Sequence, residues 1–291
     1  MPDFDDLLSQ QPEGAPAPQQ DNFDKDAWAA QKKQQREDLY ALADETAMGV
    51  ISDPAQFTQY LDVQARFDRY SPTNALLVLA QRPDATQLGD LDHWKRERVF
   101  IKRDEMPNAI TILAPGKEYE KDDGSIGTSV NAKRVYDVSQ AERPRLQPQP
   151  RYDDRALVQA VIKASPIPVE GMDQLPSGRD AAYDGMDRKI YVQRGMDAPS
   201  IFRAVAREAC YSQMDTVIED DLFDAKAGAY LICKKFGVDT QGIDLSDVKA
   251  RFGCREAKEV REVLSSVRNV AGEIAERMSK ELEPPKREAE R

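Results

Sequence analysis

A proline-rich interruption at residues 141–152 most constrains how this 291-residue chain can fold. The segment, AERPRLQPQPRY, holds three prolines and few apolar residues. Proline removes a backbone donor and restricts the residue before it, so no helix or central strand can run through this stretch. A chain of this length typically forms about two domains of ~100–200 residues. We therefore expect a linker at 141–152 between domains at 25–140 and 153–283, with a disordered tail at 1–24 and a second tail at 284–291.

The first domain begins with helical periodicity and then changes to strand periodicity. Asp53-Pro54 and Ser71-Pro72 are typical helix starts, with a capping side chain followed by proline at the first helical position. We expect helices at 26–50, from 54 to about 67, and at 74–82, followed by strands at 98–103, 109–115 and 133–140.

The second domain mixes short strands with longer helices. Gly237 ends one apolar helical pattern, as a C-terminal glycine commonly does. We expect helices at 154–164, from about 198, at 220–236 and at 255–282, and strands at 166–170, 181–183 and 189–193. Together the two patterns predict an α+β fold.

The stretch IFRAVAREACY at 201–211 poses the main functional question. Many zinc peptidases carry H-E-x-x-H on such a helix, with two histidines as ligands and the glutamate as base. The corresponding frame here has Arg207 and Tyr211 at the histidine positions and keeps only Glu208. Because the whole chain contains a single histidine, His93, no two-histidine metal site can form within it.

From the residues alone, four interpretations of this helix remain open. It is an ordinary core helix, a zinc-type helix that has lost its zinc and keeps a structural role, a helix that retains a non-zinc activity, or an unusual metal site. In each case an acid on the apolar face needs a partner, because burying an unpaired charge is expensive. Arg203 or Lys226 could supply that partner for Glu208.

Several segments resemble one protein family. RYSPTNALLVLAQRP, WKRERVFIKR and ITILAP resemble the N-terminal single-stranded DNA-binding domain of ArdC-like antirestriction proteins. DLFDAKAGAYLICKKFGVDT is similar to the helix after the zinc motif in the zincin-type metallopeptidase domain of that family. The resemblance covers most of residues 50–280 and implies a helix-plus-small-sheet domain followed by a zincin-like domain. Related chains are found on plasmids, phages and integrative elements.

The resemblance implies metal ligands at Arg207, Tyr211 and a carboxylate near Asp224 or Lys226, with Glu208 as general base. A guanidinium stays protonated and offers no lone pair, and a neutral phenol is a poor zinc ligand. Without a metal to lower the pKa of bound water from about 15.7 to about 7, Glu208 has nothing to activate. We therefore predict an inactive pseudo-metallopeptidase with no cofactor, in which Glu208 is a vestigial base.

The segment His93–Arg103 is basic, with five cations and one acid. Single-strand binders combine cations that contact phosphates with aromatic rings that stack on bases. The resemblance adds the tyrosine and the asparagine near the start of the third helix. The alternative is a solvated strand edge with Trp94 and Phe100 in the core. The predicted nucleic-acid-binding residues are Tyr70, Asn74, Trp94, Lys95, Arg96, Arg98, Lys102 and Arg103.

Bulk properties limit the functional classes. A net charge of −11 means that the whole chain is not drawn to nucleic acid, so binding needs a local basic patch. Three separated cysteines, a polar N-terminus and the lack of an apolar run of ~20 residues predict a cytoplasmic protein without a membrane partner.

Taken together, the sequence predicts a non-catalytic single-stranded DNA-binding protein of a mobile element, with a possible role in antirestriction or conjugation. The alternatives are a zincin-type metallopeptidase acting on a regulatory protein, and a pseudo-enzyme whose cleft holds a protein partner.

Overall fold

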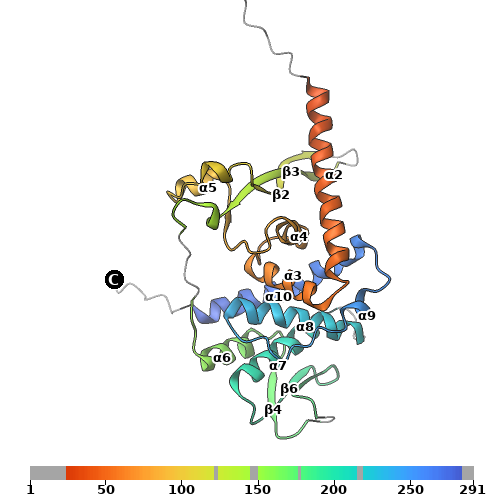
Figure 1. Cartoon of the computed structure of the whole chain (residues 1–291). Coiled ribbons are helices and arrows are strands. Elements are labelled where there is room, and N and C mark those ends of the chain that lie inside the picture. The colour runs from red at the N-terminus through yellow and green to blue at the C-terminus, as the bar shows by residue number, and fades with distance from the viewer. Residues whose placement is uncertain (1–23, 121–123, 145–149, 176–177, 215–218, 284–291) are drawn as a thin grey trace, which may run out of the picture.

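The computed structural model describes residues 24–120, 124–144, 150–175, 178–214 and 219–283 (Figure 1). The tails expected at 1–24 and 284–291, apart from Asp24, and the middle of the expected linker lie outside the described residues. The described chain is α+β, with helices and two small three-stranded sheets. None of its helices is long and apolar enough to cross a membrane.

The first sheet and its helices occupy the upper part of Figure 1. Strand β3 lies between β1 and β2, and it pairs antiparallel with each of them. The expected strands at 109–115 and 133–140 are present as the paired halves of a longer hairpin, although β3 stops at Asp137. The elements are α2 (Lys25–Val50), α3 (Pro54–Arg66), α4 (Pro72–Gln81), β1 (Leu88–Gly89), α5 (Leu91–Arg96), η1 (Arg103–Glu105), β2 (Ile110–Glu120), β3 (Ile126–Asp137) and η2 (Val138–Gln140).

The predicted helix starts are confirmed by their cap hydrogen bonds. The Asp53 carboxylate accepts from the backbone N–H of Ala55 and of Gln56, at 2.7 and 3.2 Å. The hydroxyl of Ser71 accepts from the N–H of Asn74 at 3.3 Å. In both cases a side chain satisfies backbone donors that have no partner within the helix.

The strand predicted at 98–103 is wrong. Asp90 caps a short helix, α5, by accepting from the N–H of His93 at 2.7 Å. Arg98 then adopts a positive φ of 57°, a left-handed conformation that ends the helix and turns the chain. Only Ile101 pairs with another segment, through an isolated bridge to Ala141. The basic residues are therefore spread over a helix, a turn and η1 instead of one strand face.

The second sheet lies at the opposite end of the molecule (Figure 1). Strand β6 is central; it runs parallel to β4 and antiparallel to β5. Gly237 ends α8 with a φ of 73°, as predicted. The elements are α6 (Asp154–Ala164), β4 (Val169–Met172), β5 (Ala181–Asp184), β6 (Lys189–Gln193), α7 (Ala198–Tyr211), α8 (Glu219–Phe236), α9 (Val248–Phe252) and α10 (Ala257–Leu282).

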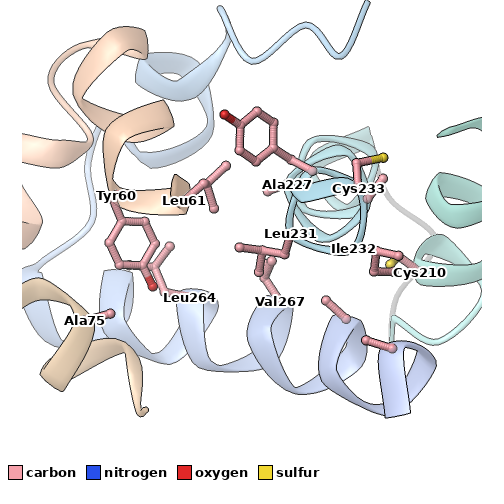
Figure 2. Packing of buried hydrophobic residues seen from close by; sticks show 14 of the residues in the cluster. Tyr60, Leu61, Ala75, Cys210, Ala227, Leu231, Ile232, Cys233, Leu264 and Val267 are labelled. Atoms are coloured by element: carbon pink, nitrogen blue, oxygen red, sulfur yellow. The ribbon is translucent and has the colours of Figure 1, made fainter. Parts of the chain in front are cut away.

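One hydrophobic cluster joins elements from both predicted domains. Figure 2 shows side chains of α3, α8 and α10 meeting in it, among them Tyr60, Leu231 and Leu264, which are nearly or fully buried. Polar contacts reinforce the same junction, since the Tyr230 hydroxyl donates to Asp62 at 2.8 Å. The expected domain boundaries stay a prediction, but the two halves share a core.

Candidate functional site

Helix α7 carries the frame Arg207-Glu208-Tyr211 and packs against β5 and β6 of the second sheet. Asp197 caps it by accepting from the N–H of Ser200 at 2.8 Å, and Pro199 lies in its first turn. Its buried face is mostly alanine, valine and phenylalanine, yet it includes Glu208, which is 3% exposed. A charged carboxylate at such a position must be compensated locally.

Glu208 is compensated by its own neighbour. Its Oε1 accepts from the Nε of Arg207 at 2.8 Å, and its Oε2 accepts from the backbone N–H of Tyr183 in β5 at 2.8 Å. The guanidinium of Arg207 continues to the carboxylate of Asp180, at 2.7 Å. The sequence offers Arg203 or Lys226 as the partner of Glu208, but in the structure Arg207 takes that role. The Arg203 guanidinium donates instead to the carbonyl of Asp239.

This Asp180–Arg207–Glu208 cluster covers the outer edge of β5. The strand pairs with β6 on one side only. On the other side, the N–H of Ala181 donates to Asp180 at 2.8 Å, and its carbonyl accepts from Arg207 at 3.4 Å. Together with the Tyr183–Glu208 bond, these contacts occupy three backbone groups of β5 that an added strand would use.

The third position implied by the resemblance, Asp224, is also held by an arginine. Its two carboxylate oxygens accept from Nε and Nη2 of Arg251 at 2.9 and 2.6 Å. Both side chains are buried, at 10% and 6% exposure. The geometry is bidentate, which is the strong form of an arginine–carboxylate pair.

The residues of this region do not fit a divalent metal ion. Arg207 cannot coordinate, and the phenol of Tyr211 lies edge-on to the ring of Tyr183, with 6.3 Å between centroids. Across the described ranges, no group of three or more His, Cys, Asp or Glu side chains is close enough together to hold a metal. The carboxylates of Glu208 and Asp224, which the resemblance assigns to the zinc site, are each bound by a guanidinium group instead.

The ionisation of the cluster follows from its contacts. Burial alone would raise the pKa of Asp180, but the hydrogen bond and the positive charge of Arg207 outweigh it and lower that pKa. Burial raises the pKa of the nearby Cys233 thiol to about 12, and burial also raises the pKa of Cys210. Neutral, buried thiols are unreactive, so neither cysteine supplies a nucleophile or a ligand.

The predicted nucleic-acid-binding residues divide into two groups. Trp94 is 2% exposed, and its indole N–H donates to the carbonyl of Tyr136 at 3.0 Å. The amide of Asn74 is buried and bonded in both directions to the backbone of Leu113 in β2. The indole of Trp94 is therefore covered, whereas Asn74 lines the groove described below with its amide already bonded to β2. Six predicted residues remain at least partly accessible: Tyr70, Lys95, Arg96, Arg98, Lys102 and Arg103.

The two aromatic residues of the basic segment differ in burial. The alternative interpretation, a solvated strand edge, predicts that both Trp94 and Phe100 lie in the core, and this is correct for Trp94 alone. Phe100 is 65% exposed. The neighbouring cations Lys95, Arg98, Lys102 and Arg103 are also exposed, and none of them forms an ion pair in the part of the chain that the structure describes.

A groove of about 740 Å³ lies beside α5, between α2, the start of α4 and the β2–β3 hairpin. Arg69, Arg96 and Lys133 contribute positive charge to its lining, and Tyr40 and Tyr70 contribute rings. Lys133 pairs with Asp90, and the Tyr70 ring stacks on Phe67 with 5.5 Å between centroids. The groove and the exposed cations of α5 therefore meet at Arg96.

Sequence reasoning missed the groove residues Tyr40, Arg69, His93 and Lys133. They come from α2, the turn before α4, α5 and β3, which are distant in sequence. Only the approach of the hairpin to α2 and α4 brings them together. No short motif signals this arrangement, although the Asn74–Leu113 bonds show how α4 is fixed against β2.

Comparison with known proteins identifies the fold. No family model matches the chain, and no curated protein matches its sequence. The chain is similar to the antirestriction ArdC protein from plasmid R388: in the Mn(II)-bound crystal structure the TM-score is 0.51 at 13% identity, covering 73% of this chain and 84% of that one. Its metal-free structure aligns with a TM-score of 0.49 at 13% identity, covering 72% and 86%. The expected α+β class and the resemblance to ArdC are thus confirmed at the level of the fold.

Proposed function

We propose that this protein is an ArdC-like, mobile-element protein that binds single-stranded DNA without cleaving a substrate. The DNA lies in the groove beside α5 and continues over the exposed cations of the segment 95–103. A role in antirestriction, as in the plasmid protein of similar fold, is part of this proposal.

The observation that carries the proposal is the set of cations without internal partners. Within the described residues Lys95, Arg98, Lys102 and Arg103 have no ion pair, while Arg96 lines the groove. The protein as a whole carries a net charge of −11, so this local concentration opposes the overall field. Unpaired surface cations contribute little to the stability of the fold, whereas they bind the phosphate groups of a nucleic acid favourably.

The groove adds features that suit an unpaired strand. Tyr40 and Tyr70 present rings beside Arg69 and Arg96, which is the combination of stacking surfaces and phosphate contacts typical of single-strand binders. Burial raises the pKa of Tyr70, so its hydroxyl stays protonated and can donate to a phosphate or a base. The ion pair between Lys133 and Asp90 keeps one cation of the lining partly neutralised.

The non-catalytic part of the proposal rests on the α7 cluster. Both carboxylate oxygens of Glu208 already accept a hydrogen bond, from Arg207 and from the backbone of Tyr183, and the residue is only 3% exposed, so a water nucleophile has little access to it. The covered edge of β5 also disfavours the alternative in which the cleft holds an extended peptide, because strand addition needs free backbone groups.

The test is a fluorescence anisotropy titration with a labelled poly-dT oligonucleotide. We expect Arg98→Glu with Lys102→Glu to weaken binding by at least about tenfold at low salt, because two phosphate contacts become repulsive. The matched control is Lys249→Glu with Lys258→Glu, which makes the same charge change at exposed positions of α9 and α10. Equal loss in both variants would mean that bulk charge decides binding, and no loss in either would overturn the proposal.

A further inference from the structure

We propose that Phe100 is a stacking platform for an unpaired base of the strand bound at the basic segment. This inference rests on the proposed function and adds to it a residue outside the groove. Phe100 is the most exposed aromatic side chain among the described residues, at 65%. Singly exposed apolar side chains are common on protein surfaces; what distinguishes Phe100 is its fixed backbone and the exposed cations beside it.

The neighbours of Phe100 explain why its ring points outward. Val99 and Ile101 pack against the small cluster of Trp94, Tyr136 and Val138. Since successive side chains of an extended segment point in opposite directions, anchoring residues 99 and 101 inward directs residue 100 outward. The exposure of the ring therefore follows from the packing of its neighbours.

The backbone on either side of the ring is fixed. The N–H of Val99 donates to the carbonyl of Trp94 at 2.8 Å, and the carbonyl of Phe100 accepts from the N–H of Glu142 at 2.9 Å. The N–H of Lys102 donates to the carbonyl of Gln140 at 3.0 Å. A side chain presented from such a backbone loses little freedom when a base stacks on it.

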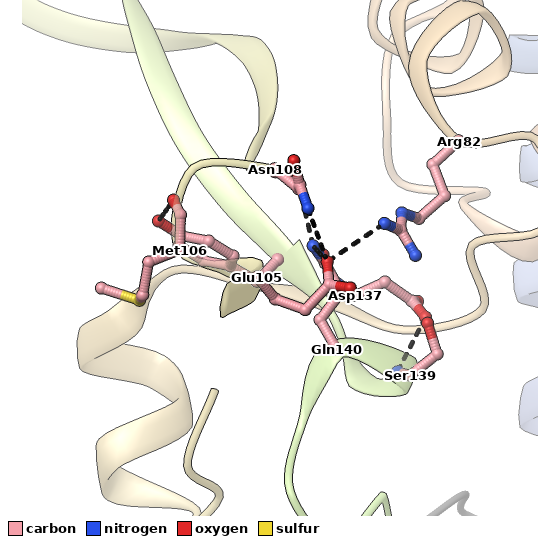
Figure 3. A network of polar contacts seen from close by, with 8 residues as sticks. Arg82, Glu105, Met106, Asn108, Asp137, Ser139 and Gln140 are labelled. Carbon is pink, nitrogen blue, oxygen red and sulfur yellow. Dashed lines mark hydrogen bonds and ion pairs between the residues drawn. The ribbon is translucent and has the colours of Figure 1, made fainter. Parts of the chain in front are cut away.

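A polar network joins the residues that follow the basic segment to the end of β3 (Figure 3). Gln140 donates to the Glu105 carboxylate at 2.8 Å and to the carbonyl of Asn108 at 2.9 Å. The side-chain oxygen of Gln140 accepts from the N–H of Asp137 at 2.8 Å, which ties the network to the end of β3. Arg82 also donates to Glu105 at 3.4 Å. The hydrogen bond from Gln140, with smaller contributions that include the charge of Lys102, lowers the pKa of this carboxylate.

The charges around Phe100 favour a nucleic acid over a protein partner. Arg98 and Lys102 lie two residues to either side of the ring, and Arg103 follows; all three are exposed. Cations flanking an aromatic face match a strand in which phosphates alternate with bases. Because the bases of a duplex are already stacked on one another, the same surface should prefer a single strand.

The experiment compares Phe100→Ala and Phe100→Trp with the parent protein in the poly-dT titration. We expect about a tenfold loss of affinity for Phe100→Ala, within the range measured for base–aromatic stacking, and near-parent affinity for Phe100→Trp. The dependence of affinity on salt should not change, because no phosphate contact is removed. Ile126→Ala, which truncates a side chain that is 73% exposed at the end of the hairpin, is the matched control and should bind normally.

The possible failures are distinguishable. If Phe100→Ala binds like the parent while the Arg98→Glu, Lys102→Glu variant does not, the stacking inference is overturned and the proposed function stands. If neither variant changes binding, both are overturned. An equal loss of affinity for duplex DNA in Phe100→Ala would also overturn stacking, since paired bases offer no free face.

Discussion

The buried arginines Arg207 and Arg251 and the basic segment 93–103 use the same kind of side chain in opposite ways. Arg207 and Arg251 are largely buried, and their guanidinium groups bind the carboxylates of Asp180 and Asp224 at 2.7 and 2.6 Å. Arg98, Lys102 and Arg103 are exposed and have no ion pair within the described ranges. A cation with internal partners stabilises the fold, whereas a cation without them is available to a ligand. The comparison therefore assigns stability to one region and binding to the other.

The largest expected effect is on the buried pair. Replacing Arg251 with Met leaves the Asp224 carboxylate in a buried site without its bidentate partner, which should cost about 3–5 kcal/mol of unfolding free energy. Urea denaturation measures this. Replacing both residues, as Arg251→Met with Asp224→Leu, should recover much of the loss; a single variant as stable as the parent would contradict the structural role.

Arg207→Ala should come next, at about 1–3 kcal/mol, because it removes the donor to Glu208 and the contact to the β5 carbonyl. Hydrogen exchange gives the sharper readout: the Tyr183 amide should lose protection, since its acceptor Glu208 is no longer held. Binding to poly-dT should stay unchanged. Arg207→Lys keeps the positive charge but not the planar guanidinium that contacts Glu208 and Asp180 together. Its stability should lie between that of Arg207→Ala and that of the parent protein.

Asn74→Ala distinguishes a DNA-binding role of Asn74 from a structural role. If Asn74 served in DNA binding, the variant would weaken binding without unfolding. The two bonds to Leu113 instead predict about 1–3 kcal/mol of destabilisation, with intact affinity in the folded fraction. Thermal denaturation together with the anisotropy titration checks this.

A smaller effect is expected from acid. The folded-state pKa of Asp180 lies below its unfolded value, so the carboxylate contributes stability above about pH 4 that is lost as the pH falls through the folded pKa. Asp180 is partly exposed, so the contribution should stay below about 1 kcal/mol. Asp180→Asn should flatten that part of the pH–stability curve, and an unchanged acid limb would refute the assignment.

The smallest effect on stability should come from substitutions in the basic segment 93–103. Arg98→Glu with Lys102→Glu removes no internal contact of either side chain and should shift the unfolding free energy by less than about 0.5 kcal/mol. A large loss of unfolding free energy in urea denaturation would mean that these cations stabilise the fold as Arg207 does, and it would contradict the division of roles between the two regions.

Local signals predicted the parts of the fold that depend on local chemistry. Asp53-Pro54, Ser71-Pro72 and Gly237 marked helix ends correctly, because capping and φ preferences act within a few residues. The segment 98–103 was misread, because its apolar residues fit a strand and the left-handed turn at Arg98 leaves no mark in the sequence. The partner of Glu208 is not evident from the sequence either, because adjacent residues of a helix point about 100° apart and Arg207 reaches Glu208 only through its long side chain.

Of the candidate DNA-binding surface, the sequence predicts only the charged residues, because composition reveals them. Which aromatic ring is accessible to DNA depends on burial, and burial depends on residues that are distant in sequence. Trp94 is covered because Tyr136 and Val138 in and after β3 meet it, while Phe100 has no such cover. The groove likewise arises from contacts among α2, α4 and the hairpin that no local pattern encodes.

The covered edge of β5 has a consequence for how copies of this protein behave when concentrated. Fibrous assembly through sheets requires an unoccupied row of main-chain donors and acceptors on a terminal strand. On β5 three groups of that row are already bonded to the side chains of Asp180, Glu208 and Arg207, so this side is a poor template for the growth of an ordered aggregate. The other terminal strand of this sheet is β4, and we expect such growth to begin there.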